Sequence, residues 1–187
     1  MPINLPTINN NWTLFLDRDG VINHEKQDDY IHNWDEFIFY DGVPEAIAVF
    51  ASIFKHIIVV TNQRGIGRGV TNINDVRLIH KNMKHKIEKA GGRIDAIYFC
   101  PDVDNESTCR KPNPGMGLQA VKDFPEIDLH KTIMIGNTIS DMQFGRNLGV
   151  KTIFLPTTRP DVSLTDERID MVCKSLIDFA GRLTKGR

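Results

Sequence analysis

The stretch that decides the fold is WTLFLDRDG at residues 12–20, an apolar run that ends abruptly in two acidic residues. A short run of this kind is typical of a strand buried on both faces. Further apolar runs follow along the chain, and segments with helical spacing of apolar residues separate them. This alternation predicts an α/β fold, a three-layer sandwich in which helices cover both faces of a central, mostly parallel sheet.

The same pattern predicts where each element lies. We expect strands over 12–17, 57–60, 94–100, 131–136, 150–155 and 170–173, and helices over 44–53, 73–90, 114–124, 139–148 and 175–184. Residues 22–42 and 101–113 remain as long loops, and the glycine-rich residues 65–69 are expected to form a flexible loop. We predict a loose lead-in over residues 1–11 and a single domain over residues 12–187. No segment between the strands is long enough to form a large cap domain.

Charge and composition exclude several kinds of partner. Lys and Arg number 23 and Asp and Glu number 24, so the net charge is −1. This balance argues against binding of nucleic acid or of an anionic membrane through bulk charge. The N-terminal segment lacks the basic and apolar regions of a secretory signal, and three cysteines do not make a disulfide framework. We therefore expect a cytoplasmic protein, and a monomer.

Polar residues follow the predicted strands at the points where the strands end. They are Asp17 and Asp19 after the first strand, Thr61, Asn62 and Gln63 after the second, Arg110 and Lys111 beyond the third, and Asn137 and Asp141 after the fourth. Ligands of open α/β sheets bind outside the carboxyl ends of the strands, so we expect these residues to share one site. Each feature by itself is common in turns and on surfaces. Their coincidence at four successive strand ends favours a functional site.

These residue types suit phosphoryl transfer. Asp17 can attack phosphorus and form an acyl phosphate, and Asp19, two residues on, can protonate the leaving group. Two carboxylates repel a phosphate dianion, which calls for a divalent cation, and an oxygen-only ligand set favours Mg²⁺. Asn137 and Asp141 can complete the shell of that ion. Thr61, the amides of the residues after it, and Lys111 can hold the phosphate oxygens.

Four motifs give the chain a family resemblance. They are FLDRDGVIN at 15–23, VTNQRGIGRG at 60–69, CRKPNPGM at 109–116 and IGNTISDM at 135–142. The sequence resembles the haloacid dehalogenase superfamily of phosphatases over residues 12–180. Within it, the chain is similar to the branch that contains the heptose-bisphosphate and histidinol-phosphate phosphatases.

The resemblance implies a role for each matching residue. Asp17 is the implied nucleophile and Asp19 the general acid and base. Thr61 and Lys111 are the implied phosphate ligands, and Arg110 is an implied substrate contact. The Mg²⁺ ligands that the resemblance implies are Asp17, the backbone carbonyl of Asp19, and position 137.

The sequence departs from the family pattern at two places. Position 137 is Asn where the family has an Asp metal ligand, so we expect Mg²⁺ to bind more weakly but still to bind. Many members of the branch also hold Zn²⁺ through a Cys-x-His…Cys-x-Cys pattern, and here Asp102 and Ser107 replace the His and one Cys. A closed zinc site needs four nitrogen or sulfur ligands, so we expect no structural zinc and two free thiols at Cys100 and Cys109.

Three functions are compatible with these residues. The first is a Mg²⁺-dependent phosphatase that removes the 7-phosphate of D-glycero-D-manno-heptose 1,7-bisphosphate, which the likeness over residues 37–42 and 65–69 favours. The second is a histidinol-phosphate phosphatase. The third, suggested by Asn137, is a non-catalytic relative that only binds a sugar phosphate.

Overall fold

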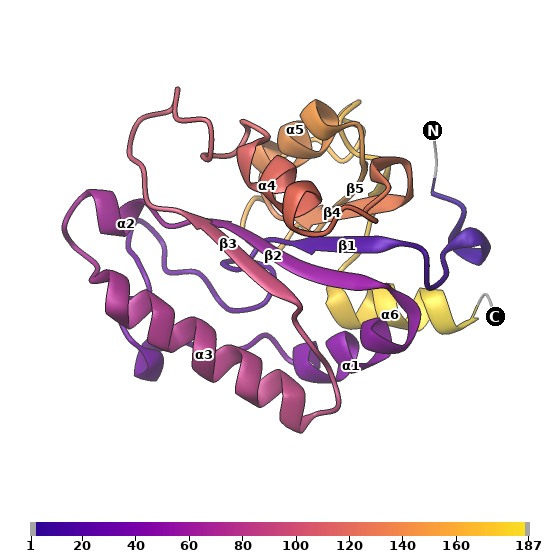
Figure 1. The fold of residues 1–187 in the computed structure, drawn as a ribbon, viewed down its shortest axis with the longest axis horizontal. Coiled ribbons are helices and arrows are strands. Elements are labelled where there is room, and N and C mark those ends of the chain that lie inside the picture. The colour runs from indigo at the N-terminus through magenta and orange to yellow at the C-terminus, as the bar shows by residue number, and fades with distance from the viewer. Residues whose placement is uncertain (1–2, 186–187) are drawn as a thin grey trace.

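A six-stranded parallel sheet forms the middle layer of the computed structural model, which describes residues 3–185 (Figure 1). Its strands lie in the order β3-β2-β1-β4-β5-β6. The bounds are β1 Thr13–Leu16, β2 His56–Asn62, β3 Ala96–Cys100, β4 Thr132–Gly136, β5 Lys151–Phe154 and β6 Met171–Val172. The predicted parallel sheet is confirmed. The order reverses at β1, so that β2 and β4 flank it and their carboxyl ends surround its own.

Helices cover both faces of the sheet, with α1, α3 and α6 on one side and α4 and α5 on the other (Figure 1). The helices are α1 Val43–Ile53, α2 Arg64–Gly67, α3 Ile73–Lys89, α4 Gly115–Asp123, α5 Ile139–Leu148 and α6 Leu176–Lys185. Three short 3₁₀ turns, η1 Leu5–Thr7, η2 Trp34–Glu36 and η3 Leu129–Lys131, complete the list. This is the predicted three-layer sandwich, and no large cap domain interrupts the described residues.

The alternation of side chains along β1 creates two apolar cores. Leu14 and Leu16 belong to the cluster beneath α1, α3 and α6, whereas Phe15 belongs to the cluster beneath α4 and α5. All three side chains are fully buried. A strand that is apolar on both faces is what a central parallel strand requires, because helices cover it from both sides.

Local sequence signals fix the ends of the helices beside the site. The Asn72 side chain caps α3 by accepting from the amide of Asn74. At α5, Thr138 and Asp141 form a reciprocal capping box, and Gly149 ends the helix in the left-handed conformation with a φ of 75°. The capping box holds Asp141 at the start of α5, directly after β4.

The structure corrects two predictions of local structure. The lead-in is not loose: Ile3 and Ile8 are buried in the core cluster that α6 also lines, because these two apolar side chains reach the sheet's covered face. Met1 and Pro2 lie outside the described residues. The glycine-rich stretch is not wholly a loop either, since residues 64–67 form the short helix α2.

No helix among residues 3–185 combines the length and the apolar character that crossing a membrane requires.

Candidate active site

Lys111 joins two acidic side chains at the centre of the sheet's carboxyl edge. Its Nζ lies 2.9 Å from Asp17 Oδ1 and 2.6 Å from Asp141 Oδ1, and it donates to the carbonyl of Val60 at 2.9 Å. Asp17 follows β1, and its amide donates to the carbonyl of Ile135 on β4. All three charged side chains are buried. A buried cation between two carboxylates leaves the trio one negative charge in excess.

Burial and the neighbouring charges shift the pKa values of Asp17 and Lys111. Burial raises the pKa of Asp17 to about 7, against the opposing effect of Lys111. Burial alone lowers the pKa of Lys111, but Asp141 and Asp17 outweigh it and hold that pKa above its ordinary value. Lys111 therefore stays charged, and a further positive charge near Asp17 would favour the carboxylate form of that side chain.

Asp19 is surrounded by hydrogen-bond donors from three residues. Arg18 Nη2 donates to both of its oxygens, at 2.8 and 2.9 Å, Asn23 Nδ2 donates at 2.9 Å, and Gln63 Nε2 donates at 2.9 Å. Burial by itself raises the pKa of Asp19, but Arg18 and the hydrogen bonds from Asn23 and Gln63 lower it below its ordinary value. The carboxyl group is thus held as a carboxylate in a fixed orientation.

The residues at the carboxyl end of β2, and the one that follows it, order the site. Thr61 is buried, and its hydroxyl accepts a hydrogen bond from Gln63 Nε2 at 3.0 Å. The Asn62 side chain accepts from the amide of Lys111 at 3.0 Å and donates to its carbonyl at 3.1 Å. Asn62 therefore fixes the backbone that carries Lys111, and its role in phosphate binding stays a prediction.

Asn137 is fully buried, and its side chain lies against Gly20. A side chain at position 20 is impossible there, because its Cβ would lie 2.0 Å from Asn137 Nδ2 and the φ of Gly20 is +79°. Asn137 Nδ2 donates to Thr158 Oγ1 at 2.6 Å. Asn137 Oδ1 is buried and has no hydrogen-bond partner among the described residues.

The donor set fits the predicted Mg²⁺. Mg²⁺ takes oxygen ligands, which the carboxylate of Asp17 and the side-chain amide of Asn137 both offer, and Asn137 Oδ1 is buried without a hydrogen-bond partner among the described residues. Asp141 is engaged differently: Oδ1 accepts from Lys111, and Oδ2 accepts from Thr138 Oγ1 and from the amides of Asn137 and Thr138. Its role as a metal ligand stays a prediction, and its observed contacts are with Lys111 and the helix start.

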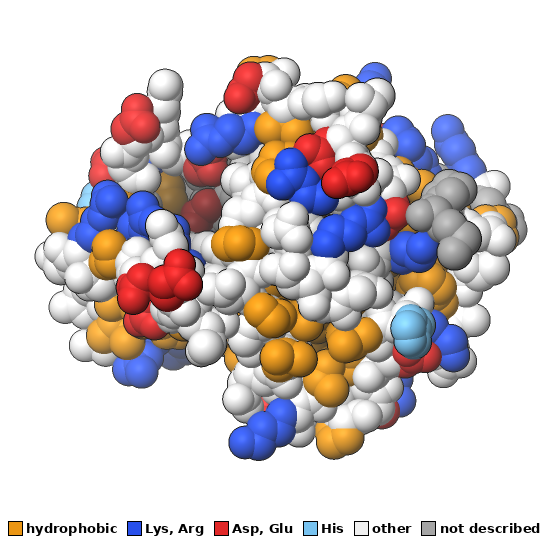
Figure 2. All heavy atoms as spheres, turned by 90° about the horizontal axis from the view of Figure 1, so that it is seen from above, with side chains coloured by type: hydrophobic (Ala, Val, Ile, Leu, Met, Phe, Trp, Pro, Cys, Tyr) orange, Lys and Arg blue, Asp and Glu red, His pale blue; other side chains and the backbone are white. Residues whose placement is uncertain are grey.

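One cavity unites the predicted site residues. It has a volume of about 290 Å³, and the predicted residues that line it are Asp17, Asp19, Thr61, Asn62, Arg110, Lys111 and Asp141. Gln63 lines a wider adjoining cavity of about 740 Å³ that shares Asp19 and Asn62. In Figure 2 a hollow on the side where the strands end contains acidic side chains in its depth and Lys and Arg side chains beside it. The structure thus brings together residues from all four strand ends, although Asn137 lines neither of these two cavities.

A cluster of arginines borders these cavities. Asn105 Oδ1 accepts from Arg64 Nη2 at 3.2 Å and from Arg110 Nε at 3.3 Å, so one amide joins two cations. Burial lowers the pKa of Arg110 below its ordinary value, and the neighbouring charges of Arg64 and Arg68 lower it further. Like charges that are held together in this way favour an anion between or beside them.

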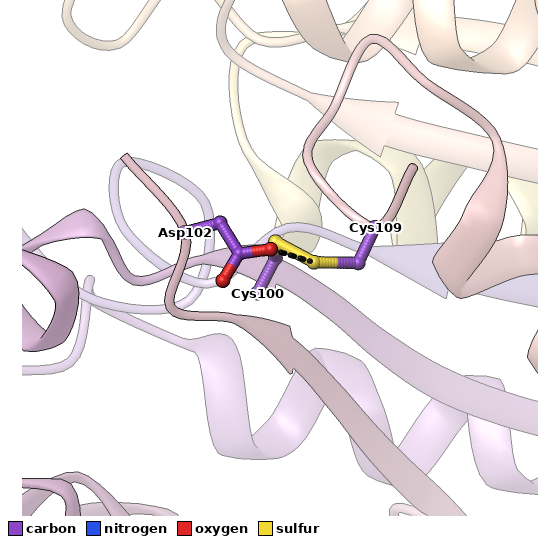
Figure 3. A group of neighbouring side chains, drawn as sticks. All are labelled: Cys100, Asp102 and Cys109. Carbon is purple, nitrogen blue, oxygen red and sulfur yellow. Dashed lines mark hydrogen bonds between the residues drawn. A yellow bond between two sulfur atoms is a disulfide. The ribbon is translucent and has the colours of Figure 1, made fainter. Parts of the chain in front are cut away.

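The loop after β3 contains a disulfide where we expected two free thiols. Cys100 and Cys109 are bonded, with Cα atoms 5.5 Å apart, because the loop folds back on itself (Figure 3). Asp102 Oδ2 lies 3.5 Å from Cys109 Sγ, and Ser107 Oγ donates to the same carboxylate. The four positions of the family's zinc pattern therefore lie together. The expectation of no zinc stays a prediction, and the cysteines no longer argue for a reducing compartment.

Sequence reasoning missed three polar side chains of the site. Arg18, Asn23 and His80 are all buried, and none was singled out. Arg18 and Asn23 contact Asp19 directly, and the motif that contains them was the available signal. His80 lies in the buried stripe of α3 with Val76 and Met83, so the apolar spacing of that helix was the available signal.

Comparisons with known proteins agree with this geometry. A family model described as HAD-hydrolase-like matches residues 108–179. The chain is 36% identical over 138 residues, 73% of each chain, to a D-glycero-alpha-D-manno-heptose-1,7-bisphosphate 7-phosphatase of Mycobacterium bovis. It is 33% identical over 181 residues to a D-glycero-beta-D-manno-heptose-1,7-bisphosphate 7-phosphatase of Pasteurella multocida. The matched residues cover 92% of this chain and 96% of that relative.

A solved structure is similar over almost the whole chain. The D,D-heptose 1,7-bisphosphate phosphatase from B. bronchiseptica, complexed with magnesium and phosphate, superimposes with a TM-score of 0.84. It is 28% identical and covers 94% of this chain and 99% of its own.

Proposed function

Because the chain belongs to the haloacid dehalogenase-like hydrolases, among relatives named heptose-bisphosphate 7-phosphatases, we propose that it removes the 7-phosphate of D-glycero-D-manno-heptose 1,7-bisphosphate with the help of Mg²⁺. The observation that carries the chemistry is the buried contact between Asp17 and Lys111 at the carboxyl end of the central strand. It supplies a nucleophile and a fixed positive charge at one point. The interpretation as a phosphatase is confirmed over the binding-only alternative, since the relatives are named phosphatases.

The first half of the reaction forms an acyl phosphate. An Asp17 oxygen attacks phosphorus, the bond between phosphorus and the sugar oxygen breaks, and a proton from Asp19 passes to that oxygen. Lys111 and Thr61 hold the oxygens of the phosphoryl group. Asp17, the Asp19 carbonyl and Asn137 would hold Mg²⁺, which would supply the positive charge that reduces repulsion between the carboxylates and the phosphate. That charge also favours the ionised form of Asp17, whose pKa burial has raised.

The second half releases phosphate. A water molecule attacks the phosphorus of the aspartyl phosphate, Asp19 takes its proton, and the bond to the Asp17 oxygen breaks. The donors around Asp19 suit this step, because they hold it as a carboxylate that can accept a proton. In the first half, the dianionic substrate raises the pKa of Asp19, since a like charge disfavours its ionised form.

The arginine cluster favours a substrate with a second phosphate. Arg64 and Arg110 line the cavity that contains Asp17, and Arg64 and Arg68 line the wider adjoining cavity. A heptose bisphosphate carries a second anion that these cations attract. Histidinol phosphate instead carries a protonated amine and no second phosphate, and the same cations repel that amine.

A phosphate-release assay tests the proposal. With Mg²⁺ present, the heptose bisphosphate is expected to be hydrolysed with a kcat/KM at least about tenfold above that of histidinol phosphate, which corresponds to about 1.4 kcal/mol of selective binding. Asp17→Asn abolishes release from both. Faster release from histidinol phosphate contradicts the substrate assignment. No release from any phosphate ester contradicts the enzyme assignment itself.

A further inference from the structure

The buried Arg18 guanidinium joins the Asp19 carboxylate to His80 on α3. On one side Nη2 and Nε donate to Asp19, with the nearest distance 2.8 Å. On the other side Nη1 lies 3.2 Å from Nε2 of His80 on α3. Arg18 is 1% exposed and His80 is 6% exposed. The charged group of Arg18 is therefore removed from water, and protein atoms replace its hydration.

The chemistry of this contact fixes the state of His80. A guanidinium only donates hydrogen bonds, so His80 Nε2 accepts, and the imidazole is neutral with its proton on Nδ1. Burial, and then the charge of Arg18, lower the pKa of His80 to about 3. The ring also packs edge-on against Phe99 of β3, with centroids 5.5 Å apart. His80 is held from two sides and presents a lone pair to Arg18.

A buried guanidinium is costly unless its donors are satisfied. Asp19 accepts hydrogen bonds from Nη2 of Arg18, and His80 accepts one from Nη1. If His80 lost its acceptor atom, Nη1 would be buried without this partner, and the guanidinium would gain by turning toward water. Asp19 would turn with it, because two of the hydrogen bonds that orient it come from the same nitrogen.

We propose that Arg18 and His80 are positioning residues that hold the Asp19 carboxyl group in place for proton transfer. The proposal rests on the phosphatase function above. It adds that a side chain of α3, 62 residues from Arg18 along the chain, controls a proton transfer at the end of β1. Asn23 and Gln63 hold Asp19 from other directions, so the loss of His80 weakens its placement without abolishing it.

The test compares two variants at one position on two substrates. His80→Leu removes the acceptor, and His80→Gln restores one through its side-chain carbonyl. The two substrates are the heptose bisphosphate, called the sugar phosphate below, and 4-nitrophenyl phosphate. The leaving oxygen of the sugar phosphate needs a proton, whereas 4-nitrophenyl phosphate releases a stable anion that needs none. His85→Leu, at an exposed position of the same helix, is the matched control.

For the sugar phosphate we expect His80→Leu to lower kcat about tenfold with KM changed less than about twofold, and His80→Gln to recover most of the loss. With 4-nitrophenyl phosphate, the initial burst of nitrophenol stays within about twofold of the unsubstituted protein, because attack by Asp17 does not need the proton. Equal losses in both reactions, or a Gln variant no better than Leu, would overturn the proposal.

Two controls keep the outcome decisive. Should His80→Leu not fold, Arg18→Lys replaces it, since a single ammonium cannot grip both Asp19 and His80, and the same selective loss is expected. If the unsubstituted protein releases no phosphate from any ester, the proposed function has failed. If it is active and the variants lose both reactions alike, only the positioning role has failed.

Discussion

Lys111 Nζ lies 2.9 Å from Asp17 Oδ1 and 2.6 Å from Asp141 Oδ1, so one buried cation binds the nucleophile and the first turn of α5 together. These residues lie far apart in the sequence and meet because β1 lies between β2 and β4. Lys111 therefore has a structural task in addition to the catalytic one that we propose for it. It stabilises two buried carboxylates before any phosphate arrives.

Removing this cation is expected to harm both stability and turnover. Lys111→Met leaves Asp17 and Asp141 buried without it, which lowers the free energy of unfolding by about 3–5 kcal/mol. Turnover falls at least about a hundredfold, because a charge that faces the phosphoryl oxygens is lost. Denaturant unfolding and phosphate release measure the two effects. Lys122→Met, at an exposed position of α4, is the control, and equal behaviour of the two variants would contradict the assigned role.

Asp17 is expected to stabilise the metal-free protein only at low pH. Its folded-state pKa is raised from 3.8 to about 7, mainly by burial, so between these values the folded state holds a proton that the unfolded state has released. The free energy of unfolding therefore falls as pH rises through this window. Asp17→Asn removes that fall and stabilises the metal-free protein at pH 7.5 by roughly 1–3 kcal/mol.

The measurement is chemical unfolding between acidic and neutral pH, in the presence of a chelator. Asp161→Asn, at an exposed loop position, serves as the control and should leave the pH dependence unchanged. A parallel pH dependence in the unsubstituted protein and in Asp17→Asn would show that Asp17 is not the source.

Asn137→Asp is expected to tighten Mg²⁺ binding. The orphaned Oδ1 becomes part of a carboxylate, which adds a negative charge to the ligand set. The Mg²⁺ concentration for half-maximal activity should fall about tenfold, equivalent to roughly 1.4 kcal/mol of added attraction. The same change removes the donor to Thr158 and sets a carboxylate near Glu25, so the metal-free variant should unfold more easily. An unchanged Mg²⁺ titration would contradict position 137 as a ligand.

Arg64→Ala is expected to weaken binding of the bisphosphate selectively. Arg64 is joined to Arg110 through Asn105 and contributes to the positive field beside the cavity. The KM for the bisphosphate should rise about tenfold with little change in kcat, since uniform binding is lost, while hydrolysis of 4-nitrophenyl phosphate stays the same. Arg77→Ala, exposed on α3, is the control. An equal effect on both substrates would show that Arg64 does not recognise a second phosphate.

The part of the site that the sequence predicted follows from one rule of topology. Asp17, Thr61 and Asp141 lie at the carboxyl ends of buried strands or about one turn beyond them, and parallel strands place these ends at one edge. The rule says where the residues gather, but it does not say which of them touch. The sequence suggested that Lys111 binds phosphate, but it did not show that Lys111 also donates a hydrogen bond to Asp141. That contact depends on how the loop before α4 folds.

What the sequence could not predict depends on distance along the chain. The Arg18 and His80 contact spans 62 residues, and no local pattern pairs them. The apolar spacing of Val76 and Met83 does place position 80 on the buried face of α3, which was the overlooked signal. The disulfide between Cys100 and Cys109 likewise depends on a loop fold that brings two Cα atoms to 5.5 Å, which a separation of 9 residues does not dictate.

The central claim is that Asp17 itself attacks phosphorus, and trapping the intermediate tests it most directly. The Mg²⁺-loaded protein is mixed with substrate, quenched within the first turnover and reduced with borohydride, which converts an aspartyl phosphate to homoserine. Peptide mass spectrometry is expected to find homoserine at position 17, and none when Mg²⁺ or substrate is omitted. Phosphate release at the normal rate with position 17 unmodified, or with the modification at another residue, would contradict the account.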